Sequence, residues 1–220
     1  MKNIKAIIFD AYGTLFDVNS AAEKCKDQIG DKWEKFSNYW RTTQLEYTWL
    51  RSLMGRHKDF WEITEDSLEK SMENFKISHS MKYELLDLYK SLSTFEEVPE
   101  TLKILKEKNY KLAILSNGTP HLLNGLVRSN KLENLFDDLF SIEEVRIYKP
   151  DSKVYGMPTK KYNIKVNEVA FLSANTWDVS GGGNYGYNAI WVNRNKNIFD
   201  KLDFKPKHAI KNLKELLNII

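Results

Sequence analysis

Cysteine and histidine are scarce in this 220-residue sequence, and their scarcity excludes the small domains that depend on them. Cys25 is the only cysteine, which excludes a disulfide scaffold. The four histidines are scattered along the chain, which excludes a zinc site of the cysteine–histidine type. A chain of this length buries roughly 70% of the surface that its unfolded form exposes, so its core holds without cross-links. We therefore expect a globular protein with no metal site.

The sequence also lacks long hydrophobic runs and a strong excess of one charge. No apolar stretch approaches the ~20 residues of a membrane span, and residues 1–5 lack the charged-then-apolar pattern of a signal segment. Lysine and arginine number 33 against 30 acidic residues, and this net charge of +3 is too small to indicate nucleic-acid binding. The lysine-rich stretch 196–207 is expected to be solvated surface. These features predict a cytoplasmic protein with neither a membrane nor a nucleic acid as partner.

Short apolar runs and helix-like stretches alternate over much of the chain, whose 42% hydrophobic residues are ordinary for a globular protein. Four of the runs are rich in strand formers and end in turn or polar residues: 4–9, 111–115, 169–172 and 189–192. Such runs are typical of buried parallel strands. Helix-like stretches begin at Pro99, Pro120 and Asp151. The alternation predicts an α/β fold with an open parallel sheet.

Residues 17–94 differ from the rest, with no proline, almost no strand signal and four of the six tryptophans. Mostly apolar side chains recur there at intervals of four and three residues: Phe36, Trp40, Thr43, Tyr47, Leu50 and Met54. This spacing places them along one face of a helix, which packs inside a helical subdomain or pairs with a second copy. We expect an α/β core of residues 1–16 and 95–220, with residues 17–94 inserted as a helical subdomain after the first strand.

Polar side chains follow the ends of three predicted strands and precede one predicted helix. They are Asp10, Ser116 and Asn117, the segment 173–178, and Lys149. Ligands of open parallel sheets bind beyond the carboxyl ends of the strands. Each residue alone could be a helix cap or turn residue. Two carboxylates, a lysine and several hydroxyl and amide groups together favour an active site.

These segments resemble the four motifs of the haloacid dehalogenase superfamily, in order. They read Asp10-Ala-Tyr-Gly-Thr14-Leu-Phe, Ser116-Asn117-Gly118, Lys149-Pro150-Asp151 and Ser173-Ala-Asn175-Thr-Trp177-Asp178. The pair Trp40-Arg41 and residues 44–51 resemble the helical cap of the L-2-haloacid dehalogenase branch. The resemblance implies a Rossmann-like core with a helical cap after the first strand. It also implies the hydrolysis of 2-haloacids to 2-hydroxy acids with inversion at C2.

Differences in two motifs separate this chain from the magnesium-dependent phosphatases of the superfamily. The phosphatases carry a second aspartate two places after the nucleophile, where this chain has Tyr12, which is a poor proton donor near neutral pH. They also hold Mg²⁺ on acidic residues of the fourth motif, where this chain has Ser173 and Asn175 beside Asp178. The differences favour a leaving group that needs no proton, such as halide, and predict an enzyme without a cofactor.

The expected reaction is a two-step displacement. Asp10 attacks C2 of the substrate and forms an aspartyl ester, which water then hydrolyses with Asp178 as general base. Because the substrate carboxylate brings a third negative charge, a cation must balance the site, and Lys149 is the expected one.

The resemblance implies roles for further residues. Arg41 and Asn117 would stabilise the departing halide, and Ser116 would bind the substrate carboxylate. Three residues would orient the two acids and the water: Thr14, Ser173 and Asn175. Five would line or contact the pocket: Tyr12, Leu45, Phe60, Tyr155 and Trp177.

Two segments depart from the family pattern. Pro158 follows Tyr155 closely, and a proline inside a helix costs ~3 kcal/mol, so we expect it to disturb the placement of Tyr155. The glycines 181–183 follow Asp178, and each costs about 1 kcal/mol in a helix relative to alanine. They indicate flexibility, which would leave Asp178 loosely held, or close packing of backbone.

Two other functions stay open on the sequence alone. One is a magnesium-dependent phosphatase of small metabolites, and the other is a scaffold with a vestigial site that associates with itself. In each case the apolar helix face predicts a homodimer formed through the cap helices. The halogen, the chain length and the enantiomer of the substrate are not set by the sequence.

Overall fold

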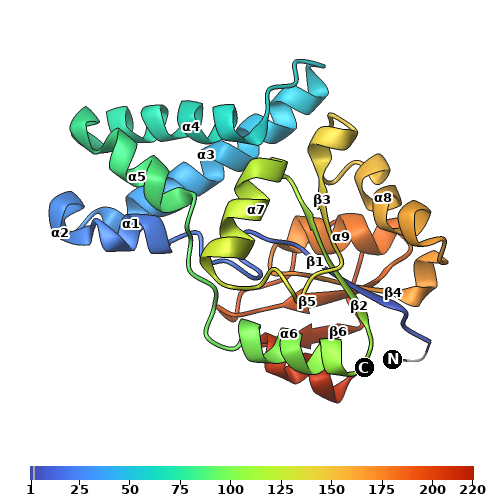
Figure 1. The fold of residues 1–220 in the computed structure, drawn as a ribbon. Helices are drawn as coiled ribbons and strands as arrows, with labels where there is room; N and C mark the ends of the chain where they lie inside the picture. Colours follow the sequence, from blue (N-terminus) through green and yellow to red (C-terminus); the bar gives the residue numbers. More distant parts are fainter. Residues whose placement is uncertain (2) are drawn as a thin grey trace.

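A six-stranded sheet, in which all strands run parallel, forms the centre of the computed structural model, which describes residue 1 and residues 3–220 (Figure 1). The strands are β1 (Ala6–Phe9), β2 (Lys111–Ser116), β3 (Asp138–Ser141), β4 (Val169–Ser173), β5 (Asn188–Val192) and β6 (His208–Ile210). Their order is β3-β2-β1-β4-β5-β6, so the first strand lies in the middle and is fully buried. The ends of β1, β2 and β4 are level, because Phe9 is in register with both Ile114 and Leu172. The α/β prediction is confirmed.

Four of the six strands coincide with the predicted runs, whereas the two edge strands were missed. The edge strands are short and only partly buried: Asp138 and Leu139 in β3 are half-exposed, and so is His208 in β6. An edge strand buries fewer side chains than a central one, and its sequence therefore carries a weaker apolar signal.

Helices cover both sides of the sheet, and their starts confirm the predictions. They are α6 (Val98–Glu107), α7 (Pro120–Ser129), α8 (Ser152–Tyr162) and α9 (Thr176–Tyr185), with short 3₁₀ turns η2 (Ile142–Glu144), η3 (Val166–Glu168) and η4 (Leu213–Asn218). Pro99 lies in the first turn of α6, and Asp151 caps α8 by accepting a 2.8 Å hydrogen bond from the Lys153 amide. In the view of Figure 1, α6 and η4 lie below the sheet and α8 and α9 above it.

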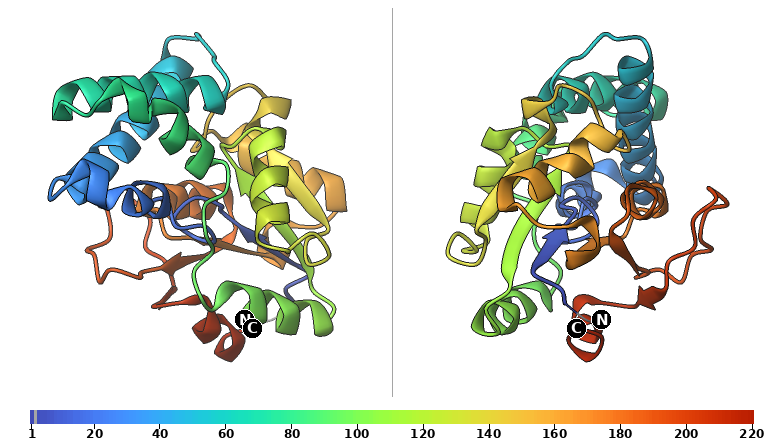
Figure 2. Two further views of the ribbon diagram at one scale, coloured as in Figure 1. Left: turned by 60° about the vertical axis from the view of Figure 1, so that its left-hand side comes forward. Right: turned by 90° about the vertical axis from the view of Figure 1, so that its right-hand side faces the viewer.

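A cluster of helices stands between β1 and α6 in the sequence. It consists of α1 (Ser20–Lys24), α2 (Lys26–Ile29), α3 (Trp33–Leu53), α4 (Phe60–Phe75), η1 (His79–Met81) and α5 (Lys82–Tyr89). The segments that lead into and out of the cluster lie side by side, because the Asp17 amide donates to the Ser93 carbonyl at 2.8 Å. Figure 2 shows the cluster standing to one side, above the sheet. None of the helices in the described part of the chain combines the length and hydrophobicity that a bilayer-spanning helix needs.

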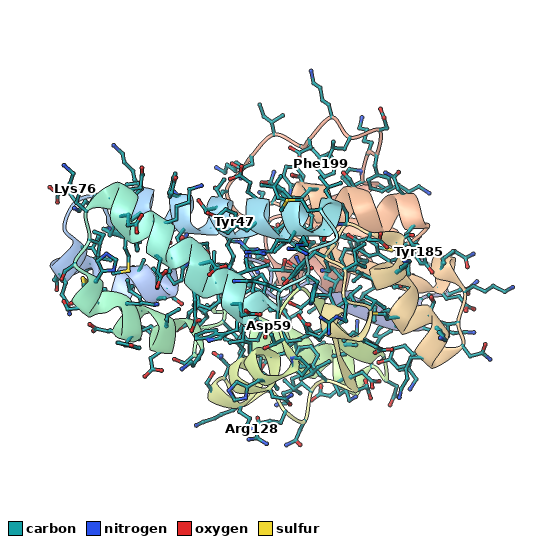
Figure 3. All side chains as sticks on the ribbon, turned by 90° about the horizontal axis from the view of Figure 1, so that it is seen from above. Tyr47, Asp59, Lys76, Arg128, Tyr185 and Phe199 are labelled. Atoms are coloured by element: carbon teal, nitrogen blue, oxygen red, sulfur yellow. The ribbon has the colours of Figure 1, made fainter. Side chains whose placement is uncertain are left out.

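The long helices α3 and α4 pack against each other across the top of the molecule (Figure 3). Asp59 caps α4, accepting a 2.9 Å hydrogen bond from the Glu62 amide, and Lys76 ends the helix. Seen from above, Asp59 lies over the middle of the molecule and Lys76 at the outer end. Phe60, the first residue of α4, is therefore at the inner end of the cluster.

The predicted apolar face of α3 is used in two different ways. Phe36, Trp40 and Thr43 are buried in the helical cluster, whereas Leu50 is 44% exposed and Met54 62% exposed. The first half of this face therefore forms core, and its second half remains an exposed apolar surface.

Candidate active site

Asp10 directly follows β1, and four side chains from three segments of the chain hydrogen-bond to it. Its Oδ2 accepts hydrogen bonds from Thr14 Oγ1 at 2.9 Å, Asn175 Nδ2 at 2.9 Å and Ser173 Oγ at 3.3 Å. Its Oδ1 accepts from Lys149 Nζ at 3.1 Å. The two oxygens thus have different surroundings, because three neutral donors hold one and a single ammonium faces the other.

The Lys149 ammonium lies between two buried carboxylates. Its Nζ is 3.1 Å from Asp10 Oδ1 and 2.9 Å from Asp178 Oδ2, and neither Lys149 nor Asp178 is more than 1% exposed. Burial lowers the pKa of Lys149, but Asp10 and Asp178 raise it by more, so the ammonium stays charged. Burial raises the pKa of Asp178 to about 6; Lys149 opposes the rise and Asp10 adds to it. Asp178 is therefore ionised at neutral pH and basic enough to accept a proton.

Tyr155 contacts Asp178 despite the proline that follows it. Its hydroxyl donates to Asp178 Oδ1 at 2.7 Å, and its side chain is fully buried. The expectation that Pro158 would disturb this residue is wrong, because α8 runs without a break from Ser152 to Tyr162. Pro158 and Met157 are buried with Tyr155, so packing in the core offsets the missing helical hydrogen bond.

The glycines 181–183 lie inside α9, where they allow the helix to pack closely on its neighbours. A Cβ at Gly181 would lie 2.4 Å from the Tyr155 hydroxyl, and one at Gly182 would lie 2.6 Å from the Phe171 ring. One at Gly183 would lie 2.1 Å from the Phe204 ring. The close-packing interpretation is confirmed. The expectation of a loosely held Asp178 is wrong, since this helix brings Asp178 against Tyr155 and Lys149.

The end of β2 brings two further predicted residues to the same edge of the sheet. Asn117 Oδ1 accepts a 3.1 Å hydrogen bond from the Lys149 amide, and Ser116 Oγ accepts one of 3.0 Å from the Gly118 amide. Ser116 is fully buried, and Asn117 is 6% exposed. Because their oxygens are used as acceptors, the Asn117 amide hydrogens and the Ser116 hydroxyl hydrogen remain available as donors.

The helical cluster adds Arg41 and Phe60 to the site through Tyr12. The Arg41 Cζ lies 5.8 Å from the centroid of the Tyr12 ring, and the Phe60 ring lies 5.2 Å from it. The half-buried Arg41 donates a 2.7 Å hydrogen bond to the neutral Gln44 Oε1, and none of the salt bridges within residues 1 and 3–220 includes it. The Tyr12 hydroxyl is buried and has no hydrogen-bond partner in that part of the chain. A cation and an unused hydroxyl therefore adjoin the loop that carries Asp10.

Leu45 and Trp177 come from α3 and α9, which touch where the helical cluster meets the core. Leu45 is half-buried one turn after Arg41 on the same face of α3. Trp177, near the start of α9, packs edge-to-face on Trp49 of α3, with ring centroids 5.4 Å apart. Trp49 was not predicted, and neither was Tyr89 of α5, which stacks on Tyr12 at 5.7 Å. An aromatic residue on a helix gives no sequence signal that separates such a contact from ordinary core packing.

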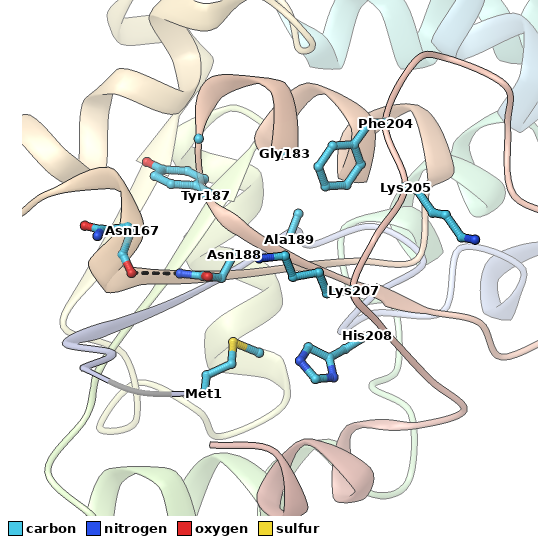
Figure 4. A pocket seen from close by; sticks show the side chains of 11 residues that line it. Met1, Asn167, Gly183, Tyr187, Asn188, Ala189, Phe204, Lys205, Lys207 and His208 are labelled. Carbon is cyan, nitrogen blue, oxygen red and sulfur yellow. Dashed lines mark hydrogen bonds between the residues drawn. The ribbon is translucent and has the colours of Figure 1, made fainter.

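A separate hollow of about 480 Å³ lies beside α9, away from Asp10 (Figure 4). Tyr187, Phe204 and Lys207 are among its lining residues, and no residue predicted for the site lines it. The Tyr187 hydroxyl donates to the Tyr155 carbonyl, so this hollow borders the support of Tyr155.

Comparison with known proteins agrees with this geometry. A family model described as haloacid dehalogenase-like hydrolase matches residues 4–186. The chain belongs to this family. It is 39% identical over 220 residues to the (S)-2-haloacid dehalogenase of Pseudomonas fluorescens, covering 99% of this chain and 97% of that protein. It is 40% identical over 223 residues to (S)-2-haloacid dehalogenase 1 of Pseudomonas sp. (strain CBS-3), covering 100% and 98%.

A solved structure of the family superimposes on nearly the whole chain. It is the L-2-haloacid dehalogenase of Xanthobacter autotrophicus with chloropropionic acid covalently bound. The TM-score is 0.91 at 30% identity, and the match covers 98% of each chain. The family-type fold of the core, predicted from the motifs, is confirmed.

The residues around Asp10 do not fit the magnesium site of the phosphatases in the superfamily. The facing oxygens of Asp10 and Asp178 already bind the Lys149 ammonium, and Ser173 and Asn175 contribute neutral groups. Within residues 1 and 3–220 no group of three or more histidine, cysteine or acidic side chains is arranged to hold a metal ion. A hard divalent ion prefers carboxylate and water oxygens, and the two carboxylates of this site already face the Lys149 ammonium.

Proposed function

We propose that the protein hydrolyses short 2-haloalkanoic acids to 2-hydroxy acids through an ester on Asp10, with inversion at C2. The observation that carries the proposal is the pair of buried carboxylates bridged by the Lys149 ammonium, at 3.1 and 2.9 Å. The ammonium balances the negative charge of the two carboxylates that it bridges. The relatives named (S)-2-haloacid dehalogenase, and the Xanthobacter structure with covalently bound chloropropionic acid, support the same reaction.

The first step forms a bond between Asp10 Oδ1 and C2 of the substrate while the bond from carbon to halogen breaks. Oδ1 is the better nucleophile of the two oxygens because only Lys149 contacts it, whereas three donors occupy Oδ2. The halide leaves with the electron pair, and attack from the opposite side inverts C2.

Donors aimed at the departing halide accelerate this step because negative charge develops there. Arg41 supplies a guanidinium whose hydrogen bond goes to a neutral amide oxygen, and Asn117 supplies amide hydrogens. The Ser116 hydroxyl binds the substrate carboxylate. The apolar wall around the carbon chain is proposed to consist of four side chains: Tyr12, Leu45, Phe60 and Trp177.

The second step cleaves the ester. Asp178 takes a proton from water, and the water oxygen attacks Cγ of Asp10. The negative charge that forms on Oδ2 is stabilised by the three donors already in place, Thr14, Ser173 and Asn175. The Cγ–Oδ1 bond then breaks, and the product oxygen receives the proton from Asp178. The second proton of the water remains on Asp10 and leaves to solvent, which restores the carboxylate. The product hydroxyl therefore contains an oxygen of Asp10, and Asp10 retains an oxygen from water.

The arrangement of the chain is part of the proposal. Residues 17–94 act as a cap over the catalytic core, which comprises residues 1–16 and 95–220, because they bring Arg41 and Phe60 to a site otherwise built on strand ends. Two copies pair through the cap helices, where Leu50 and Met54 leave an apolar surface exposed. The location is proposed to be cytoplasmic, which fractionation of the source cells would test.

Halide release tests the function directly. The purified protein should release chloride from (S)-2-chloropropionate at the same rate with EDTA as with Mg²⁺, and Asp10→Asn should release none. Activity towards a phosphate ester that EDTA abolishes and Mg²⁺ restores, without halide release from haloacids, would favour the phosphatase instead.

A further inference from the structure

Gln44 is a buried amide that contacts the guanidinium of Arg41. It follows Arg41 by three residues on α3, which places both side chains on one face of the helix. Gln44 is 1% exposed, and its Oε1 accepts a 2.7 Å hydrogen bond from Arg41 Nη1. An aspartate or glutamate would hold the arginine as well, but it would cancel the positive charge. A neutral acceptor orients Arg41 and leaves its charge available to an anion.

Hydrogen bonds within the cap determine which end of the Gln44 amide faces Arg41. The Thr64 hydroxyl donates its hydrogen to the Phe60 carbonyl at 2.7 Å, so its oxygen can only accept from Gln44. Gln44 Nε2 lies 2.7 Å from that oxygen and must be the donor. The carbonyl end of the amide is therefore turned towards Arg41. This sequence of bonds connects the backbone of α4 to the arginine.

Tyr89 ties the same amide to the loop of the nucleophile. Its hydroxyl lies 3.1 Å from Gln44 Nε2, and its ring stacks on Tyr12 with an interplanar angle of 19°. Burial raises the pKa of Tyr89, so it remains a neutral phenol. Gln44 thus joins α3, α4 and α5 at the point where the cap meets Tyr12, two residues after Asp10.

We propose that Gln44 is a positioning residue that holds Arg41 in the orientation needed to stabilise the departing halide. This inference rests on the proposed function, in which Arg41 contacts the leaving group. Gln44 itself touches no reacting atom. Its loss should therefore act through Arg41, and more strongly for a leaving group that needs more stabilisation.

The experiment compares Gln44→Leu in two backgrounds, the natural chain and Arg41→Met, with 2-chloropropionate and 2-bromopropionate as substrates. In the natural background we expect kcat to fall about tenfold with the chloro acid and about threefold with the bromo acid, since small displacements of positioned groups carry losses of this order. In the Arg41→Met background, Gln44→Leu should change kcat by less than about twofold. Equal losses for both substrates, or equal losses in both backgrounds, would overturn the proposal.

Thr48→Val is the matched control. Thr48 is buried on α3 one turn after Gln44, and its hydroxyl donates to the Leu45 carbonyl of the same helix. Loss of this hydroxyl should leave the ratio of kcat with 2-chloropropionate to kcat with 2-bromopropionate unchanged. If Gln44→Leu does not fold, the pair Thr64→Val and Thr64→Ser replaces it. The valine variant should shift the ratio and the serine variant, which keeps the hydroxyl, should restore it; the same ratio in both would overturn the proposal.

Bromide binding separates a failure of this inference from a failure of the proposed function. Bromide alone is titrated into each variant and followed by tryptophan fluorescence. We expect Gln44→Leu to weaken bromide binding severalfold in the natural background and to have no effect in Arg41→Met. Turnover of neither haloacid by the natural chain would refute the function, and the bromide titration would still decide the role of Gln44. Unchanged bromide affinity in Gln44→Leu would refute that role.

Discussion

The two halves of the site are built in different ways. On the core side, Asp10 lies just beyond β1 and Asp178 in the first turn of α9. Both are fully or nearly buried, and at least two side chains hydrogen-bond to each. On the cap side, Arg41 is half-buried and a single neutral amide accepts its 2.7 Å hydrogen bond. The core is therefore suited to hold the reacting groups rigidly, whereas the cap presents a charge and apolar surface to whatever enters.

This difference predicts how substitutions in the two halves should behave. Changes to Asp10, Asp178 and Lys149 on the core side should block or slow a chemical step regardless of the halogen. The effects of changes on the cap side should depend on the leaving group or on the carbon chain length of the substrate. The predictions below test this division, beginning with the largest effect.

Asp10→Asn and Asp178→Asn should stop the reaction at different points. Without the Asp10 carboxylate no ester forms, so we expect kcat to fall by at least about 10⁴-fold with no burst of halide. Asp178→Asn should still form the ester and release about one equivalent of halide per site before stalling. Rapid-quench measurement of halide with substrate in excess distinguishes the two. A burst from Asp10→Asn would contradict the assignment of the nucleophile.

Lys149→Met should lower both activity and stability. It leaves two buried carboxylates without their cation, and breaking a buried ion pair in this way costs about 3–5 kcal/mol of unfolding free energy. A cation near a carboxylate at 4 Å contributes about 4 kcal/mol at an effective dielectric constant of 20, so we expect kcat to fall roughly 10³-fold. Urea unfolding and steady-state kinetics measure the two effects. Lys153→Met, an exposed change on α8, is the control and should alter neither.

The loss of kcat in Arg41→Met should depend on the leaving group, whereas the losses in Asp10→Asn, Asp178→Asn and Lys149→Met should not. Loss of one donor to a developing negative charge costs about 10²–10³ in kcat. We expect the larger loss with 2-chloropropionate and the smaller with 2-bromopropionate, while the chloro-to-bromo ratio of Lys149→Met stays near that of the natural chain. If the ratio moves in Lys149→Met and not in Arg41→Met, the division between core and cap is wrong.

The pH dependence should report Asp178, whose pKa burial raises to about 6. A general base must be ionised, so activity should be full above this pKa and fall tenfold per pH unit below it. Ester hydrolysis should show this limb in single-turnover experiments. Halide release in the first turnover should not follow it, since Asp178 takes no proton in that step. If the rate of halide release in the first turnover fell with the same midpoint, the titration would belong to another group.

Trp177→Phe should have the smallest effect. The edge-to-face contact with Trp49 closes apolar surface between cap and core, and such ring pairs contribute about 0.5–1.5 kcal/mol. We expect KM to rise a fewfold for longer haloacids while kcat changes by less than about twofold. Steady-state kinetics over a series of chain lengths tests this, and a large fall in kcat with an unchanged KM would place Trp177 in the chemistry.

The core half was predictable from the sequence because parallel strands carry their carboxyl ends to one edge. Asp10, Asn117 and Ser173 follow or end apolar runs, so their meeting required only the topology of the sheet. The cap half was not predictable in the same way. Gln44 and Tyr89 depend on the packing of three helices, and nothing in their local sequence separates a positioning residue from a buried one.

The errors have a related origin. Pro158 and the glycines 181–183 were assessed by their local helix propensities, but α8 and α9 bury them against Tyr155, Phe171 and Phe204, and tertiary packing decides the outcome. The edge strands were missed because strands of three or four residues, partly exposed, carry little pattern. The sequence was therefore sufficient to predict the strands that are fully buried and carry a regular apolar pattern.

The central claim is that Asp10 forms a covalent ester with the substrate, and isotope transfer in a single turnover tests it most directly. Enzyme in excess is mixed with (S)-2-chloropropionate in H₂¹⁸O, and the protein and product are analysed by mass spectrometry. We expect one ¹⁸O atom in the peptide that contains Asp10 and unlabelled lactate of inverted configuration. Label in the lactate with none on Asp10 would mean that water attacks C2 directly, and it would contradict the mechanism.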